Sequence, residues 1–226
     1  MDNQPLASHH IQSRPVGTPI QRQVGGVIAD LIASLPDPEL LTSESRRGII
    51  ARYTSVLEAN FIYWMTATLL SVRSEESRQI ILTNLQDEVR DAHPAMLRRF
   101  ALAAHAFPTD SDALAVTDEL TQVRLFLGRL LSVQAVLTMA CFEGFIQKFM
   151  AYLTDLAGAQ GSAEREYTDV HGVCDIAHTD DLYRVVELEI ALKPMESDAD
   201  LLEGVYLLRK LIQSIIHYRA VPEFSA

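Results

Sequence analysis

The sequence predicts an all-α protein folded as a single bundle of about six or seven helices. From about Pro19 onward, apolar residues recur with the period of a helix, and the alternation typical of β-strands is rare. Capping-type residues and prolines mark where these segments begin and end. The chain has 226 residues, of which 48% are hydrophobic, so it can bury a sizeable core without disulfides or structural zinc.

The N-terminal quarter of the chain predicts a tail and two helices. Residues 1–17 are polar and interrupted by proline and glycine, which is typical of a mobile tail. We expect residues 18–226 to form one domain. Its first helix runs from about Ile20 to Leu35, where the Pro36/Pro38 pair stops it. The capping-type start Thr42-Ser43-Glu44 opens the second helix, which continues to residue 72.

The rest of the chain predicts four further helices. An interruption is expected near Pro94, because proline disfavours the helical conformation of the residue before it. Gly128 predicts a second break, and residues 158–161 predict a loop. The expected helices are Ser77 to about Phe107, Asp110 or Asp112 to about Leu156, Ala163 to Leu192, and Asp198 to His217.

Charge and composition exclude several classes of partner. The formal net charge is −11, from 30 acidic and 19 basic residues, and such a field repels nucleic acid and anionic membrane surfaces. The sequence contains no run of eighteen apolar residues, so we expect no membrane span. Its first residues lack the basic-then-apolar order of a secretory signal. The two cysteines, Cys141 and Cys174, lie in apolar-periodic segments and are expected to be buried thiols. We therefore expect a cytoplasmic protein.

One segment carries a spacing typical of metal ligands. His171, Asp175 and His178 are separated by four and three residues, so on a helix they lie along one face. Two imidazoles and a carboxylate on one stripe can hold iron, manganese or zinc. The alternative is a solvated surface stripe, which the polar residues 179–181 favour.

Three other places offer ligands among apolar neighbours. Glu143 and Glu58 each lie on an apolar helix face, where a carboxylate is costly to bury unless it is paired or binds a metal. Glu88 and His93 lie beside the irregularity expected at Pro94. Each glutamate alone could be a boundary residue whose head reaches solvent. Four helices that each supply an inward ligand favour a metal centre instead.

The order of these residues resembles that of a known family. It is similar to the order of ligands in the haem-oxygenase-like diiron oxidases with three histidines and four carboxylates. The residues that carry the resemblance are Glu58, then Glu88 with His93-Pro94, then Glu143, then the segment 171–178. The resemblance covers about residues 58–178. It implies a seven-helix bundle with two irons in its core. Known chemistries of the family are N-oxygenation, fatty-acid decarboxylation, and desaturation, fragmentation or ring closure of amino acids.

The resemblance also implies a ligand for each position of the centre. Glu88, His93 and His171 would hold one Fe²⁺, while Glu143, Asp175 and His178 would hold the second, with Glu58 bridging or completing it. Dioxygen would be the co-substrate. Glu88 and His93 are five residues apart, so both can bind one ion only if the helix is unwound there. Asp91, three residues after Glu88, is the alternative ligand.

Other metal chemistries fit the sequence less well. Ferritin-type centres use paired Glu-x-x-His motifs, and none occurs here. Haem would need an axial histidine in an apolar pocket rather than a carboxylate-rich one. Thiaminase-like relatives use a cysteine nucleophile, whereas Cys141 and Cys174 are interpreted as small core residues. A helical partner-binding or scaffold protein without enzymatic activity is the alternative from a different class.

The expected substrate follows from the predicted cavity and the resemblance. Its lining should be largely aliphatic and suit a compact substrate: Phe61, Ile62, Met65, Val136, Met139 and Ile146. The family implies desaturation or cyclisation of an aliphatic amino acid, azetidine formation included, with N-oxygenation of an amine as the alternative. Arg209 or Lys210 would bind the substrate carboxylate. Electrons would come from an external donor, and an apolar helix pair could form a homodimer.

Overall fold

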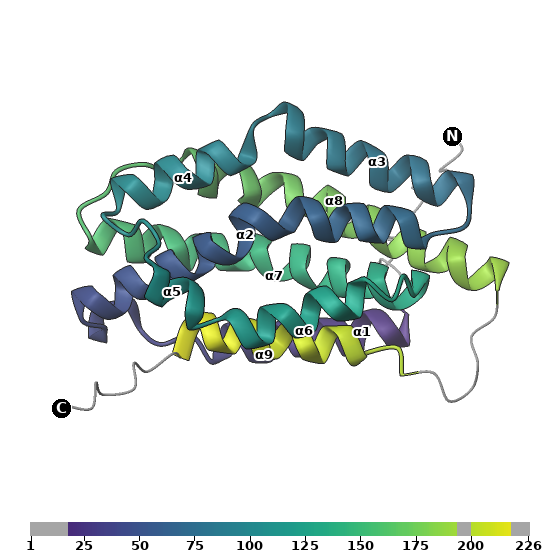
Figure 1. Ribbon diagram of the computed structural model, residues 1–226, viewed down its shortest axis with the longest axis horizontal. Helices are drawn as coiled ribbons and strands as arrows, with labels where there is room; N and C mark the ends of the chain where they lie inside the picture. The colour runs from purple at the N-terminus through teal and green to yellow at the C-terminus, as the bar shows by residue number, and fades with distance from the viewer. Residues whose placement is uncertain (1–17, 194–199, 218–226) are drawn as a thin grey trace, which may run out of the picture.

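The protein is an all-helical bundle in a computed structural model that describes residues 18–193 and 200–217 (Figure 1). These residues form nine α-helices and one short 3-10 helix, and they contain no strand. The predicted fold class is confirmed, although the helix count exceeds the six or seven expected. The predicted tail lies outside the described residues. The elements are α1 (Pro19–Ala33), η1 (Pro38–Leu40), α2 (Ser43–Ser71), α3 (Glu75–Arg90), α4 (His93–Ala103), α5 (Asp110–Leu114), α6 (Thr117–Leu127), α7 (Ser132–Ala159), α8 (Glu166–Leu192) and α9 (Glu203–His217).

The higher count arises because two of the predicted helices are divided. The expected third helix becomes α3 and α4, which meet at Ala92 with φ 57°, in the left-handed region. The expected fourth helix becomes α5, α6 and α7. The α6–α7 break follows Gly128, as predicted, and includes Leu130 with φ 54°. A left-handed residue cannot continue a right-handed helix, so each of these positions redirects the chain.

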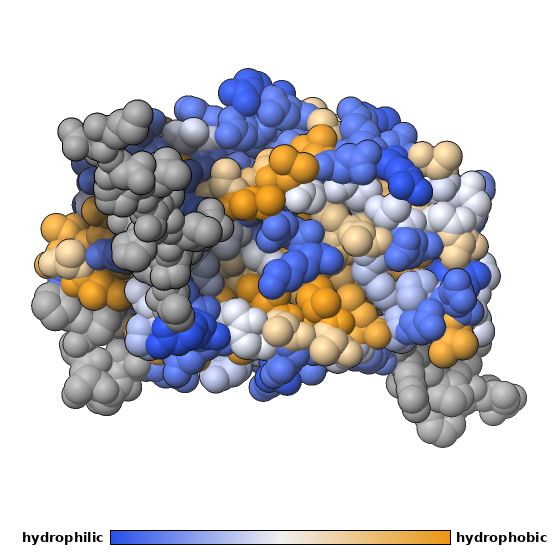
Figure 2. All heavy atoms as spheres, turned by 180° about the vertical axis from the view of Figure 1, so that it is seen from behind, coloured by the Kyte–Doolittle hydropathy of each residue, from blue (hydrophilic) through white to orange (hydrophobic). Residues whose placement is uncertain are grey.

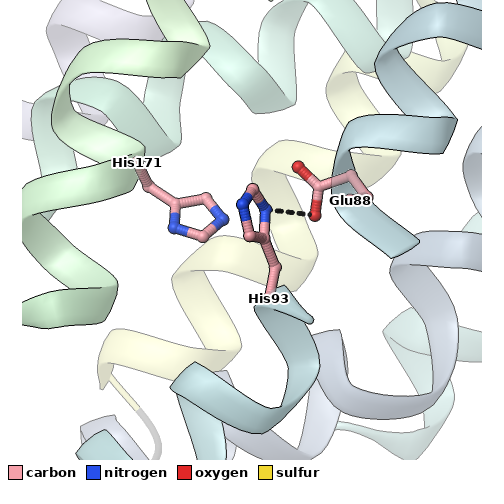
Figure 3. Close-up of side chains that lie close together, drawn as sticks. All are labelled: Glu88, His93 and His171. Atoms are coloured by element: carbon pink, nitrogen blue, oxygen red, sulfur yellow. Dashed lines mark ion pairs between the residues drawn. The ribbon is translucent and has the colours of Figure 1, made fainter. Parts of the chain in front are cut away.

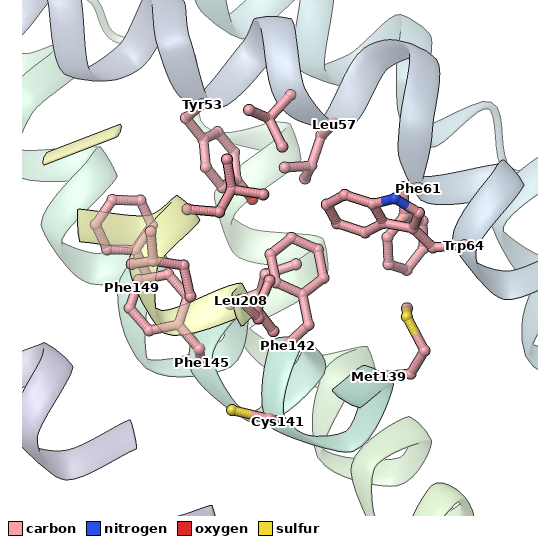
Figure 4. Packing of buried hydrophobic residues seen from close by; sticks show 14 of the residues in the cluster. Tyr53, Leu57, Phe61, Trp64, Met139, Cys141, Phe142, Phe145, Phe149 and Leu208 are labelled. Atoms are coloured by element: carbon pink, nitrogen blue, oxygen red, sulfur yellow. The ribbon is translucent and has the colours of Figure 1, made fainter. Parts of the chain in front are cut away.

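The helices are arranged around α7, which contacts α1, α2, α8 and α9. In Figure 1, α3 and α4 lie along the top of the bundle and α1, α6 and α9 along the bottom, with α2, α7 and α8 between them. Large rings from α2 and α7 fill the core, where Trp64 packs edge-on against Phe142 with centroids 5.2 Å apart (Figure 4). The predicted ligands lie on α2, α3, α4, α7 and α8. The candidate site therefore belongs to the upper half of the bundle as drawn in Figure 1.

Buried polar contacts fix the start of α3, the helix that carries Glu88. The Oγ of Ser74 caps this helix by accepting a hydrogen bond from the amide of Ser77 at 2.8 Å. The Glu189 carboxylate of α8, which is buried, accepts hydrogen bonds of 3.0–3.1 Å from the main-chain amides of Arg73 and Ser74. These bonds tie the N-terminus of α3 to α8, and a carboxylate there also opposes the positive end of the helix dipole.

The surface of the described residues mixes polar and apolar side chains. On the face turned away from the viewer of Figure 1, apolar areas are separated by hydrophilic side chains (Figure 2). Val173 and Ile176 on α8 are among the exposed apolar residues, at 70% and 48%. Within the described ranges, none of the helices combines the length and the apolar character that crossing a membrane requires. The homodimer stays a prediction.

Candidate metal centre

Six of the seven predicted ligands have buried side chains. Their exposed fraction is 6% or less, although all six are ionisable. Such groups are rarely buried unless they are paired or bind a metal. The six buried residues are Glu88, His93, Glu143, His171, Asp175 and His178.

The first group joins the end of α3, the start of α4 and the second turn of α8. One ligand atom from each of Glu88, His93 and His171 lies within 4.8 Å of the other two. The His93 ring lies between the other two side chains, with its Nδ1 2.9 Å from Glu88 Oε2 (Figure 3). The rings of His93 and His171 have centroids 4.5 Å apart. The three ligands predicted for one ion are therefore brought together.

The turn between α3 and α4 differs in detail from the expectation. The left-handed residue is Ala92, whereas His93 is already the first residue of α4 and Pro94 the second. Proline is favoured in the first turn of a helix, which explains why it does not displace His93. The neighbouring Asp91 is 46% exposed and pairs with Arg90, so it lies outside the group. His93 therefore belongs to the group and Asp91 does not, and the role of His93 as a ligand stays a prediction.

His171 is held in the tautomer that metal binding requires. Its Nδ1 donates a hydrogen bond of 2.9 Å to the main-chain carbonyl oxygen of Tyr167, which leaves the lone pair of Nε2 free. Burial lowers the pKa of His171 to about 4, against the opposing effect of the Glu88 carboxylate. The ring is therefore neutral at neutral pH, as a ligand must be.

The second group lies further along α8 and faces α7. A ligand atom from each of Cys174, Asp175 and His178 lies within 4.8 Å of the others. The His178 Nδ1 is 3.8 Å from Oε2 of Glu143, too far for a hydrogen bond, and its Nε2 is 3.9 Å from Oδ2 of Asp87. Glu143 thus lies beside this group without belonging to it, so its role as a ligand of the second ion stays a prediction.

Two pKa shifts show how strongly the carboxylates of this group affect one another. Burial and the charge of Glu143 raise the pKa of Asp175 to about 10. Burial lowers the pKa of His178, but Glu143, Glu88 and Asp87 outweigh that effect and raise it overall. A cation placed among these carboxylates would remove the repulsion between them.

Glu58 differs from the other six predicted ligands. Its side chain is 21% exposed and pairs with Arg98 of α4. Like Glu143, it belongs to neither group of close ligand atoms among the described residues, and its bridging role stays a prediction. It does line the cavity at the first group, together with Leu57, Phe61, Ile62, Glu88, His93, Pro94, Leu97, Glu143, Ile146, Tyr167 and His171.

This cavity agrees only in part with the predicted one. Phe61, Ile62 and Ile146 line it as expected, whereas Met65, Val136 and Met139 are buried in the core. The lining comes from α2, α3, α4, α7 and α8, so Arg209 and Lys210 of α9 do not contribute to it. A cation, Arg98, pairs with the lining residue Glu58, and the sequence did not indicate it because the two residues are forty positions apart.

The buried ligand atoms show that the residues present fit a metal. Each of the following atoms is buried and has no hydrogen-bond partner: Glu88 Oε1, Glu143 Oε1, Asp175 Oδ2 and His178 Nδ1. Leaving a buried polar atom unpaired costs about 1–3 kcal/mol, and more when it is charged. Metal ions bound by nitrogen and oxygen donors would satisfy these atoms, and neutral imidazole with carboxylate is a donor set that suits iron.

Fold and site together define a helical bundle protein with a candidate non-haem metal centre in its core. The model of a family described as iron-containing redox enzymes, of the haem-oxygenase-like type, matches residues 50–211. This range covers more than half of the chain and includes all seven predicted ligands. The chain therefore belongs to this family, which supports an oxidoreductase that contains iron. A search of curated proteins finds no match.

Proposed function

We propose that the protein is a non-haem diiron oxidase that activates dioxygen and functionalises a C–H bond of a free aliphatic amino acid. The observation that carries this proposal is the pair of adjacent ligand groups, each with at least one buried ligand atom that lacks a hydrogen-bond partner. Membership in a family of iron-containing redox enzymes supports iron as the metal. It also argues against the alternative of a scaffold protein without enzymatic activity.

Two groups of residues would hold the two ions. Glu88, His93 and His171 form the first, and Glu143, Asp175 and His178 are the nitrogen and oxygen donors of the second. When bound, two ferrous ions would supply the electrons and the open coordination positions that dioxygen reduction needs. The chain orients His171 through the Tyr167 carbonyl and keeps water away by burying every ligand of both groups.

The cavity beside the first group supports a compact, apolar substrate. Most of the side chains in its wall are apolar: Leu57, Phe61, Ile62, Pro94, Leu97 and Ile146. The space inside that a water molecule can reach is ≈ 20 Å³, about enough for one water. An amino acid therefore enters only when side chains of the wall move. Arg98, which pairs with Glu58 at this cavity, would bind its carboxylate.

A metal analysis followed by single-turnover chemistry tests the proposal. Protein purified from iron-supplemented cells should contain two irons per chain, and Asp175→Ala should lose the second iron while keeping its helical circular-dichroism signal. Anaerobic ferrous protein is then mixed with a panel of aliphatic amino acids and exposed to oxygen, and the products are analysed by mass. A product that has lost hydrogens supports C–H functionalisation. A product that has gained oxygen on nitrogen would instead show N-oxygenation, and absence of iron would refute the metal centre.

A further inference from the structure

Cys174 lies on the same face of α8 as the predicted ligands of that helix. It follows His171 by three residues and precedes His178 by four, spacings that bring helical side chains onto one stripe. Its Sγ, a carboxylate oxygen of Asp175 and a ring nitrogen of His178 lie within 4.8 Å of one another. A sulfur atom is thus present among the ligand atoms of the second group.

The neighbours of this thiol indicate a cation rather than a completed hydrogen-bond network. Asp175 is fully buried, and its Oδ1 accepts a hydrogen bond of 3.1 Å from the Cys174 thiol. Its Oδ2 has no hydrogen-bond partner, and neither has Nδ1 of His178, which is 6% exposed. Both side chains beside the sulfur therefore carry an atom without a hydrogen bond, and an ion bound between the three residues would offset the cost of burying them.

We propose that Cys174 is a metal ligand of the second group, together with Asp175 and His178. On binding, the S–H bond breaks, a metal–sulfur bond replaces it, and the proton leaves to solvent without any change in oxidation state. The thiol is only partly buried, so solvent can receive the proton. Because thiolate is softer than the donors of the first group, the two positions would differ in metal preference. This inference rests on the proposed metal centre.

Cobalt(II) is a suitable probe, because sulfur ligation adds a near-ultraviolet charge-transfer band to the visible ligand-field bands of the bound ion. Cobalt(II) is added to the metal-free, full-length protein under anaerobic conditions, and absorption is recorded. We expect both kinds of band in the wild-type protein. In Cys174→Ser, the charge-transfer band should be lost while the ligand-field bands persist, since Glu88, His93 and His171 are unchanged. Cys174→Ala should behave in the same way.

Cys141 provides a matched control, because it is the chain's other cysteine and is fully buried in the apolar core (Figure 4). Cys141→Ser should keep the charge-transfer band. Ligand-field bands without a charge-transfer band in the wild-type protein would overturn the role of Cys174 and leave the metal centre intact. A charge-transfer band that survives in Cys174→Ser would also overturn it. Absence of all cobalt bands would refute the metal centre itself.

Discussion

The hydroxyl groups of Tyr53 and Tyr167 lie 2.8 Å apart and are hydrogen-bonded between α2 and α8. Both side chains are buried, and burial raises the pKa of each phenol well above its usual value. The pair is therefore neutral at neutral pH. Since the carbonyl of Tyr167 orients His171, this bond fixes the part of α8 that supports the first group of ligands.

A double-mutant cycle measures what this bond contributes. Tyr53→Phe or Tyr167→Phe alone leaves one buried hydroxyl without its partner, so each should lower the free energy of unfolding by about 1–3 kcal/mol. The double variant should be no less stable than either single variant, because no unpaired hydroxyl remains. Urea unfolding, monitored by circular dichroism, gives the free energy of unfolding of the wild-type protein, both single variants and the double variant. Strictly additive losses would show that the two hydroxyls do not interact.

The identity of the ligand at the α3–α4 turn can be tested by a pair of substitutions. His93→Ala should abolish iron binding at the first group, because it removes a buried imidazole 2.9 Å from Glu88. Asp91→Ala should retain the metal, since this carboxylate is 46% exposed and pairs with Arg90. Iron content per chain after anaerobic loading and desalting is the measurement. The opposite pattern would make Asp91 the ligand.

A buried ion pair between α2 and the start of α5 predicts a loss of stability in acid. The Asp112 carboxylate accepts two hydrogen bonds of 3.1 Å from Arg47 and two more from Thr109. Burial alone would raise the pKa of Asp112, but the bonds from Arg47 and Thr109 outweigh it and lower the pKa. A pKa lowered in the folded state stabilises the protein above the unfolded value of about 3.9, and this stabilisation disappears as pH falls through the folded pKa.

We therefore expect Asp112→Asn to be clearly less stable than the wild-type protein at pH 7. The difference in the free energy of unfolding between the two proteins should become smaller as pH falls below about 4, because the wild-type protein then loses the same interaction by protonation. Denaturant unfolding of both proteins over this pH range is the measurement, and the difference between them isolates Asp112 from other acid-sensitive groups. A difference in the free energy of unfolding that does not change with pH would show that the charge of Asp112 is not the cause of the stabilisation.

The part of the site that lies on regular helix could be predicted from the sequence. The spacing of His171, Asp175 and His178 determines their common face as long as α8 is unbroken, and the apolar neighbours of Glu143 indicate its burial. The turn that brings His93 to Glu88 was expected only in outline. The residue with the left-handed conformation at this turn is an alanine. A glycine there would have indicated a left-handed residue in the sequence, whereas an alanine does not.

Contacts between residues far apart in the sequence could not be predicted from the local hydrophobic pattern. Glu58 has apolar neighbours like those of Glu143, yet it pairs with Arg98 at the edge of the cavity, because α4 runs alongside α2 there. Cys174 was interpreted as a core residue, although it is only partly buried and its thiol bonds to Asp175. Periodicity identifies the face of a helix, whereas these partners depend on how the helices pack.

Arg98 is the residue that should determine affinity for an amino-acid substrate. It pairs with Glu58, which lines the cavity, and its side chain is 59% exposed, so it can exchange this partner for a substrate carboxylate. Loss of a charge-assisted bond of about 1.5–3 kcal/mol corresponds to roughly 10–100-fold weaker binding. Arg98→Met should raise KM by this factor while iron content and kcat change little.

The neighbouring Arg99 offers a control of the same type and similar exposure. It pairs with Glu166, which does not line the cavity, so Arg99→Met should leave KM unchanged. Substrate binding to the anaerobic, iron-loaded proteins, measured by calorimetry, separates affinity from turnover. Equal affinities in Arg98→Met and the wild-type protein would exclude Arg98 as the carboxylate-binding residue. A loss of iron in Arg98→Met would show instead that Arg98 acts on the metal centre, through its ion pair with Glu58.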